Sequence, residues 1–314
     1  MHTTATVRPD IADSLIEYAR DSRGQFMGSE IFPVYRTSEK TGDFHKIEVG
    51  QATQATGSLV RAPGATYDRI QHVTTSDNYA CVEYGIEEAI DDSDRRRLQN
   101  YFNCELEAGI LCMRHLLLKY EVRVAEIAFD ASTFSGYTGG VSTEWNNSGA
   151  PNNDIADTKL TIKQNLGGVI DPGSEWCLAI SETVRQNIVQ NSNVQSLLRG
   201  GTGANEDKYI NVQDEALAAV LGVDRLFYSA AQDNGSDVWD DEYALLFVRR
   251  GDNLLTAGPQ LGRTFMWETD APETALVETY RDEARRSDVI RVRQNVDEKL
   301  LMVEAGYLLS NIST

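Results

Sequence analysis

Residues 93–130 read SDRRRLQNYFNCELEAGILCMRHLLLKYEVRVAEIAFD, with no proline and one glycine. Apolar residues recur along this stretch at steps of three or four: Leu98, Phe102, Leu106, Ile110, Met113, Leu117, Tyr120, Val124 and Ile127. The steps average close to the 3.6 residues of a helical turn, so they predict one uninterrupted helix over about residues 93–129. The acidic run at 91–94 supplies an N-cap and favourable charge at its start.

The predicted helix is unusually long. At 1.5 Å per residue, the part from Leu98 to Ile127 is a rod roughly 45 Å long, whereas an average helix has about eleven or twelve residues. A helix of this length indicates a molecule whose job needs a stiff strut.

The sequence before the strut changes character twice. Residues 10–22, DIADSLIEYARDS, form a short amphipathic piece that is too small for a core of its own, so residues 1–30 are predicted to be an arm. Residues 31–82 contain β-prone pieces broken by Gly, Pro and Ser/Thr clusters. Two extended segments joined by GQATQATGS predict a long hairpin that must lean on another surface.

After the strut, helical and strand patterns alternate between residues 155 and 250, which predicts a compact α/β-like unit. EWCLAIS, RLFYSAAQ and YALLFVRRG have the pattern of buried strands, and the segments between them that of short helices. Residues 274–312 then predict a long antiparallel hairpin, turning near EARRS, and one further strand.

The charge of the chain narrows the possible functions. With 48 acidic and 29 basic residues the formal net charge is −19, which argues against a surface built to grip a nucleic-acid backbone. No run of eighteen apolar residues predicts a membrane span. Cys81, Cys104, Cys112 and Cys177 form no CxxC pair, so they fit a reduced cytoplasmic setting as buried small side chains.

No constellation of residues predicts an enzyme, and no cofactor or metal site is predicted. Cys112 and His115 lie three residues apart on the strut, but a metal site there would need two more ligands. The acidic run 233–242, DNGSDVWDDE, lacks the oxygen spacing of an EF-hand loop and fits a solvated loop better than a divalent-cation site.

Positive charge gathers in two places: Arg95, Arg96 and Arg97 at the start of the strut, and Arg285 and Arg286 at the predicted hairpin turn. They can be solvated charges, or they can contact carboxylates of neighbouring copies, whose geometry suits the guanidinium fork.

The order of arm, strand-rich excursion, long helix, α/β unit and closing hairpin resembles the major capsid protein of tailed bacteriophages, whose fold encapsulin shells share. The sequence of residues 154–200 also resembles the start of that family's axial domain; it reads DIADTKLTIKQNLGGVIDPGSEWCLAISETVRQNIVQNSNVQSLLRG. The resemblance implies an α+β fold with an arm (1–30), an extended loop (31–82), a peripheral domain (83–154 and 264–314) that holds a spine helix, and an axial domain (155–263).

The resemblance also implies a function and partners. The chain would assemble into hexamers and pentamers of an icosahedral head around double-stranded DNA, built in the host cytoplasm and kept in the virion. Scaffold, portal and decoration proteins would be further partners. The chain starts only about thirty residues before the extended loop, so the resemblance implies that a fused scaffolding segment is either already removed or replaced by a separate scaffold protein.

The resemblance selects cationic residues as candidates for contacts between subunits. Those of the extended loop are Arg36, Lys40, Lys46, Arg61 and Arg69, and they join Arg95, Arg96, Arg97, Arg285 and Arg286. Two alternatives remain: an encapsulin-like compartment shell or another phage structural protein such as a tail-tube component, and an enzyme whose motif is not recognised.

Overall fold

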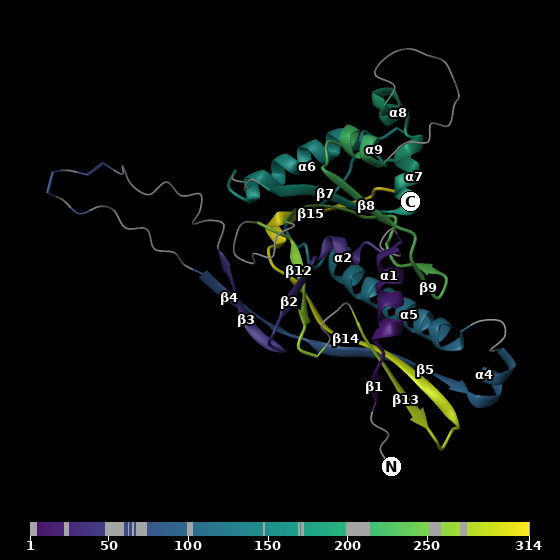
Figure 1. Cartoon of the computed structure of the whole chain (residues 1–314). Helices are drawn as coiled ribbons and strands as arrows, with labels where there is room; N and C mark the ends of the chain where they lie inside the picture. The colour runs from purple at the N-terminus through teal and green to yellow at the C-terminus, as the bar shows by residue number, and fades with distance from the viewer. Residues whose placement is uncertain are drawn as a thin grey trace.

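A computed structural model describes residues 5–21, 25–47, 60–61, 63–64, 66, 74–98, 103–146, 148–168, 170, 173–198, 214–250, 259–270 and 275–313. Two larger β-sheets dominate it, with the long helix α5 (Cys104–Ala128) between them and further helices beyond the second sheet (Figure 1). This mixture agrees with the predicted α+β class.

The first sheet is organised around one long strand, β14 (Ser287–Leu300). In order, the strands are β1 (Thr6–Val7), β13 (Leu276–Asp282), β14, β12 (Gly262–Trp267) and β2 (Val34–Thr37), and β5 (Val82–Asp91) also pairs with β14. Val292 lies between Val277 of β13 and Ile86 of β5, so these two strands flank β14 on opposite sides. The predicted closing hairpin is β13 and β14.

The strut is two helices rather than one, which corrects the prediction of an uninterrupted helix over 93–129. Helix α4 (Asp92–Leu98) comes first, and α5 begins afresh after Asn103. The Asn103 side chain accepts hydrogen bonds from the backbone N–H groups of Glu105 (3.2 Å) and Leu106 (3.4 Å), which caps α5. Residues 99–102, between the helices, lie outside the described residues. The 25 residues of α5 span roughly 37 Å.

The acidic run at 91–94 begins α4, not α5. The Asp91 carboxylate accepts the backbone N–H of Ser93 at 2.8 Å, as a cap does. The apolar spacing hid the break because it continues across two helices of the same period.

Helix α1 (Pro9–Asp21), the amphipathic piece of the predicted arm, packs on α5. Its Ile11 and Leu15 join Ala108, Cys112, Met113 and Leu116 of α5 and Ile290 and Val292 of β14 in one buried cluster. The single glycine of the strut explains the close fit: a Cβ at Gly109 would lie 3.3 Å from Leu15 and 3.4 Å from Ile11. The short helix α2 (Gly28–Ile31) follows.

Strands β3 (Thr41–Ile47) and β4 (Thr74–Ala80) form the predicted hairpin, which projects away from both sheets (Figure 1). Its predicted tip lies outside the described residues. At its base, Phe44 and Tyr79 stack on Phe265 of β12, with ring centroids 5.2 and 4.4 Å apart. The base therefore leans on the first sheet of the same chain.

The second sheet has the order β6 (Thr138–Gly140), β15 (Gly306–Ser310), β11 (Ala244–Arg250), β7 (Ser174–Ser181) and β8 (Arg225–Ser229). Helices α6 (Pro151–Asn165), α7 (Glu182–Gln190), α8 (Ser192–Leu198) and α9 (Asp214–Leu221) cover one face. Leu178 and Ile180 of β7 join that core, whereas Cys177 and Ala179 face the core that contains α5. The predicted buried strands are β7, β8 and β11.

The sheet pairing does not follow the predicted boundaries at residues 154 and 264. Strands β6 and β15 lie within the ranges predicted for the peripheral domain, but they pair with each other, and β15 pairs with β11 of the predicted axial domain. After β14 a short 3₁₀ turn, η2 (Val303–Ala305), leads the chain from the first sheet into the second. The small hairpin of β9 (Gln232–Asp233) and β10 (Ser236–Asp237) occupies the acidic run.

Replacing Leu15 with alanine tests the packing of α1 on α5. Leu15 is fully buried, so Leu15→Ala should lower the free energy of unfolding by about 2–5 kcal/mol. The matched control is Leu160→Ala on α6, where leucine is largely exposed and the change should stay within about 0.5 kcal/mol. Urea denaturation of the unassembled chain measures both, and equal values for the two variants would contradict this packing.

Candidate inter-subunit contact surface

The turn between β13 and β14 presents two arginines at the far end of the first sheet. Asp282 shapes this turn, because its carboxylate accepts the backbone N–H groups of Ala284 (3.0 Å) and Arg285 (3.2 Å). Arg286 adopts a left-handed backbone with φ of 51°. The turn lies where the sequence predicted it, between β13 and β14. The side chains of Arg285 and Arg286 on it are 79% and 72% exposed.

A shallow hollow lies between this turn and the start of α4. It is lined by Asp91, Asp92, Ser93, Arg96, Ala284, Arg285 and Arg286. The backbone N–H of Asp92 donates to the carbonyl oxygen of Arg286 at 3.2 Å and joins the two walls. The ion pairs from the turn arginines are long, 3.7 Å from Arg285 to Asp282 and 4.0 Å from Arg286 to Asp92. Among the described residues, both guanidinium groups therefore keep most of their donors available.

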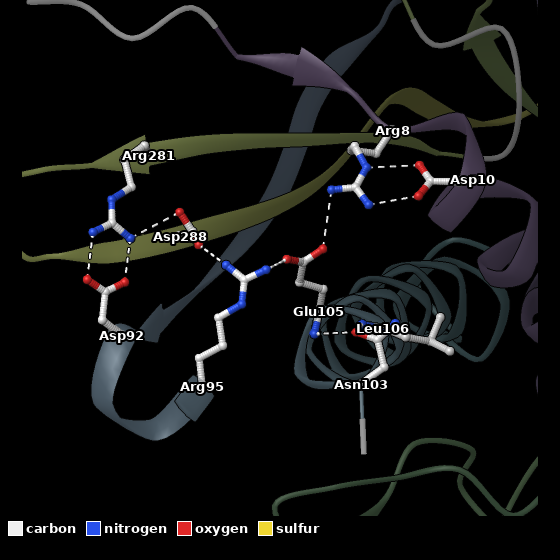
Figure 2. Close-up of polar contacts among 9 residues, drawn as sticks. All are labelled: Arg8, Asp10, Asp92, Arg95, Asn103, Glu105, Leu106, Arg281 and Asp288. Atoms are coloured by element: carbon white, nitrogen blue, oxygen red, sulfur yellow. Dashed lines mark hydrogen bonds and ion pairs between the residues drawn. The ribbon is translucent and has the colours of Figure 1, made fainter. Parts of the chain in front are cut away.

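A chain of charged side chains holds the walls of the hollow in place (Figure 2). Arg281 donates two hydrogen bonds to Asp92, at 2.7 and 2.8 Å, and one to Asp288 at 3.1 Å. Arg95 then bridges Asp288 to Glu105. The hydrogen bonds from Arg281 lower the pKa of Asp92 below its usual value. This chain of contacts ties α4 to β13, β14 and the start of α5.

The same chain of contacts reaches the N-terminal part of the molecule. Arg8 donates to Glu105 at 3.2 Å and, with two bonds, to Asp10 (Figure 2). The hydrogen bonds from Arg8 lower the pKa of Asp10 to about 2. Glu105 therefore accepts hydrogen bonds from two arginines: Arg8, which follows β1, and Arg95 of α4.

The predicted arginines at 95–97 have different surroundings. Arg95 is committed to Asp288 and Glu105 of its own chain, and Arg97 pairs with Asp94 at 3.0 Å. Arg96 lines the hollow together with Arg285 and Arg286. The structure therefore brings members of the two predicted clusters together, which their separation in sequence did not reveal.

Two of the predicted cations of the extended loop, Arg36 and Lys40, come just before the projecting hairpin in the chain. Arg36 is exposed on β2, and Lys40 lies 5.6 Å from the ring centroid of Trp267. Arg61 is exposed. Arg69 and the side chain of Lys46 lie outside the described residues.

One buried carboxylate escaped the sequence analysis. Glu121 of α5 is fully buried and accepts hydrogen bonds from the backbone N–H groups of Met27 (2.7 Å) and Gly28 (2.8 Å) and from the indole of Trp239 (2.8 Å). Its place between Leu117 and Val124 in the apolar spacing was the available signal. A carboxylate four residues after one buried position and three before the next falls on the buried face.

The two candidate metal sites considered from the sequence were Cys112 with His115 and the acidic run 233–242, and the described residues do not form either of them. Cys112 is buried while His115 is exposed, and burial raises the pKa of the Cys112 thiol to about 11. In the acidic run, Asp233 pairs with Lys119 at 2.6 Å and Trp239 is buried. Among the described residues no group of three His, Cys, Asp or Glu side chains is placed to hold a metal ion. Likewise, no described helix has the length and apolar character of a membrane span.

Comparison with solved structures identifies proteins that share this fold. No protein-family model and no curated protein matches the chain. A phage-related protein from Bordetella bronchiseptica RB50 matches it with a TM-score of 0.67 over 98% of each chain, at 20% identity. The capsid of the cyanophage P-SCSP1u matches with a TM-score of 0.59 over 92% of this chain and 88% of that one, at 11% identity. The fold is the capsid fold.

The capsid fold extends to non-viral shells. The holo-SrpI encapsulin complex from Synechococcus elongatus PCC 7942 matches with a TM-score of 0.50 over 90% of this chain and 86% of that chain, at 12% identity. The fold predicted from the order of elements, one that phage capsid proteins share with encapsulins, is therefore confirmed.

Removing Arg281 tests the charged contacts behind the hollow. We expect Arg281→Met to lower the urea midpoint at pH 7, because Asp92 and Asp288 lose a shared partner. The pKa of Asp92 is lowered in the folded chain, so its contribution exists above the ordinary value of 3.8 and disappears as the pH falls below it. The deficit of the variant should therefore shrink as the pH is lowered toward about 3.

Arg114→Met is the matched control, since Arg114 is exposed on α5 and has no ion pair among the described residues. Equal midpoints for the two variants at pH 7 would show that the contacts of Arg281 do not stabilise the sheet end.

Proposed function

We propose that the chain is a major capsid protein, a structural subunit rather than an enzyme, that assembles with copies of itself into hexamers and pentamers of an icosahedral phage head around double-stranded DNA. The capsid fold over nearly the whole chain is the observation that carries this proposal. Its place is then the virion.

The projecting hairpin supports assembly. A two-stranded hairpin is at best marginally stable alone in water. Phe44 and Tyr79 anchor only the base of the β3–β4 hairpin on Phe265. The strands of this hairpin project from the two sheets (Figure 1) and would gain stability by lying over a neighbouring copy, with Arg36, Lys40, Lys46, Arg61 and Arg69 as candidate contacts.

The hollow at the sheet end is the second proposed contact. Arg285, Arg286 and Arg96 line it with donors available for carboxylates, and the subunit carries 48 acidic residues. Arg–carboxylate pairs between copies would combine charge with directional hydrogen bonds. Arg95 and Arg97, which pair within the chain, are the weaker candidates of the predicted set.

The parts of the molecule take the roles that the capsid fold suggests. The first sheet with α5 would be the peripheral domain, and the second sheet with α6 to α9 the axial domain. The net charge of −19 suits the wall of a DNA container, because it disfavours sticking of the entering DNA. Packaged DNA would be touched without sequence specificity, and scaffold, portal and decoration proteins would complete the head.

An encapsulin-like compartment is the second candidate, and the match to the SrpI encapsulin complex favours it. The two candidates differ in contents: a phage head encloses DNA, and a compartment of this kind encloses protein.

The size and contents of the particles formed by the chain test both candidates. We expect sedimentation and negative-stain microscopy of the purified chain, alone or with a co-expressed scaffold protein, to reveal rings, tubes or closed shells. Nuclease-protected DNA in particles from infected or induced cells would support the head, and protein cargo would support the compartment. A monodisperse monomer or dimer under all these conditions would contradict both.

Reversing the charge of the turn tests the proposed contact at the hollow. Arg285→Glu combined with Arg286→Glu should give a folded subunit that assembles poorly, because carboxylates of the neighbour would meet like charge. Assembly yield by sedimentation and melting temperature by circular dichroism separate the two effects. The loss of shells should be at least tenfold, since one lost charged contact of about 1.4 kcal/mol per subunit already changes an equilibrium by that factor.

The double variant Arg285→Lys with Arg286→Lys keeps the charge and is the matched control. The lysine variant should assemble better than the glutamate variant. Its own assembly should be weaker at high salt than at low salt, because screening weakens exposed ion pairs. Normal shells from the glutamate variant would remove this turn from the contact surface.

A further inference from the structure

Glu121 connects three parts of the chain that are far apart in sequence. Its carboxylate accepts N–H groups from Met27 and Gly28 in the N-terminal part, and from Trp239 in the loop after β10. Met27, Ile31 and Phe32 are buried in the same cluster as Val124 of α5 and Trp239. Residues 25–32, here called the docked segment, therefore lie on α5 with Glu121 beneath them.

The fit around the carboxylate is tight on the side of the docked segment. A Cβ at Gly28 would lie 2.7 Å from Oε2 of Glu121 and 3.2 Å from the ring of Tyr120. A side chain at this position would therefore force the Glu121 carboxylate to shift. Opening of the docked segment would consequently remove two of the three donors and expose the carboxyl to water.

We propose that Glu121 makes the docking of residues 25–32 on α5 sensitive to pH, so that the segment is held most firmly when the carboxyl carries a proton and opens more readily once it ionises. The contacts lie within one subunit, and they apply whether or not the chain assembles into a shell.

No counter-ion compensates the buried charge among the described residues. Arg123, two positions further along α5, binds Glu298, and Glu30 of the docked segment binds Arg249. On the same helix Tyr120 directs its hydroxyl to Thr264, and beside Trp239 the carboxylate of Asp240 is exposed. Arg36 lines the cavity beside Glu121 but forms no ion pair with it. The hydrogen bonds to the ionised carboxylate therefore come from three N–H groups.

A cavity gives protons access to this site. About 230 Å³ in volume, it lies between α1, α2, β2, α5, β12 and β14, and its lining includes Glu121, Tyr120, Phe26, Arg36 and Gln294. The amide nitrogen of Gln294 is buried and has no hydrogen-bond partner among the described residues. A polar space of this size can hold water, which is the carrier for proton exchange with Glu121.

Burial and hydrogen bonding oppose each other at Glu121, and burial is the larger effect. Removal from water raises its pKa from 4.5 to about 7, although the N–H groups of Met27, Gly28 and Trp239 act in the opposite direction. In the open form the exposed carboxyl regains its ordinary pKa. A proton therefore binds the docked form more strongly than the open form.

The sign of the pH dependence follows from this difference. Below pH 4.5 both forms are protonated and docking is strongest. Between pH 4.5 and about 7 only the open form ionises, so opening rises with pH, and above about 7 it levels off. The two pKa values correspond to a rise of roughly 300-fold in the opening constant.

Other contacts determine how rare opening is. Ser229 donates to the carbonyl oxygen of Gln25 at 2.6 Å, and Arg249 donates to that of Glu30 at 3.1 Å. These bonds hold the ends of the docked segment to the second sheet. They set the level of opening at a given pH, whereas Glu121 sets how that level changes.

Hydrogen exchange measured by mass spectrometry tests the proposal on the purified full chain. Exchange of peptides covering residues 25–32, divided by their intrinsic exchange rates, gives the opening constant between pH 4.5 and 8.5. The wild-type constant should rise by up to roughly 300-fold, and in Glu121→Gln, which cannot ionise, it should be flat. Glu126→Gln removes an exposed carboxylate from the same helix and should behave as wild type.

A second variant keeps the test decisive if Glu121→Gln does not fold. Trp239→Phe removes one donor to the ionised carboxylate and so raises the pKa of Glu121 in the docked form only. The rise in opening should start at the same pH but level off at a higher pH, with Glu121 still present. A wild-type opening constant that does not change with pH would overturn the proposal. The same would follow from an unchanged rise in Glu121→Gln, or from a rise in Trp239→Phe that levels off at the wild-type pH.

Discussion

Helix α5 has to be buried by two different cores, and the rest of the molecule is arranged around that constraint. Its first half contributes Cys112 and Met113 to the core shared with α1 and the first sheet. Its second half contributes Val124 and Ala128 to the core beneath the second sheet. Because one rigid helix belongs to both cores, it fixes how the two sheets are placed relative to each other.

Small residues make this double burial possible. Gly109 lets α1 approach closely, and Ala108, Ala125 and Ala128 are buried in the two cores. Larger side chains at these places would move α1 or the sheets away and open gaps, which close-packed interiors tolerate poorly. The same crowding leaves Glu121 surrounded by backbone N–H groups and an indole instead of water.

Much of the fold was predictable because its signals are local. The apolar spacing indicated α5, the apolar runs indicated β7 and β11, and the arginine-bearing turn between β13 and β14 was visible in the sequence. The break before α5 was not, because Asn103 caps a helix whose apolar spacing continues upstream. The sequence also does not show which of the two sheets β15 joins, since five β-prone residues can pair in either sheet.

The sequence indicates which arginines belong to the candidate site, but it does not indicate which side chains they contact. The arginines at 95–97 and 285–286 stand out in the sequence, yet nothing local tells that Arg95 bridges Glu105 and Asp288 while Arg96 lines the hollow. Those pairings depend on the fold bringing α4 beside β13 and β14. Glu121 is the opposite case: the sequence analysis missed it, although its position in the apolar spacing indicates burial.

The placement of β14 has a mechanical consequence. The hairpin joins the body through two strands: β4 continues through Cys81 into β5, and β3 follows β2, which pairs with β12. Strands β5 and β12 then run along opposite edges of β14. A force pulling on the hairpin along these strands is shared between both edges and loads many backbone hydrogen bonds in shear at once. Tension there would be spread through the body of the subunit before any single bond is peeled away.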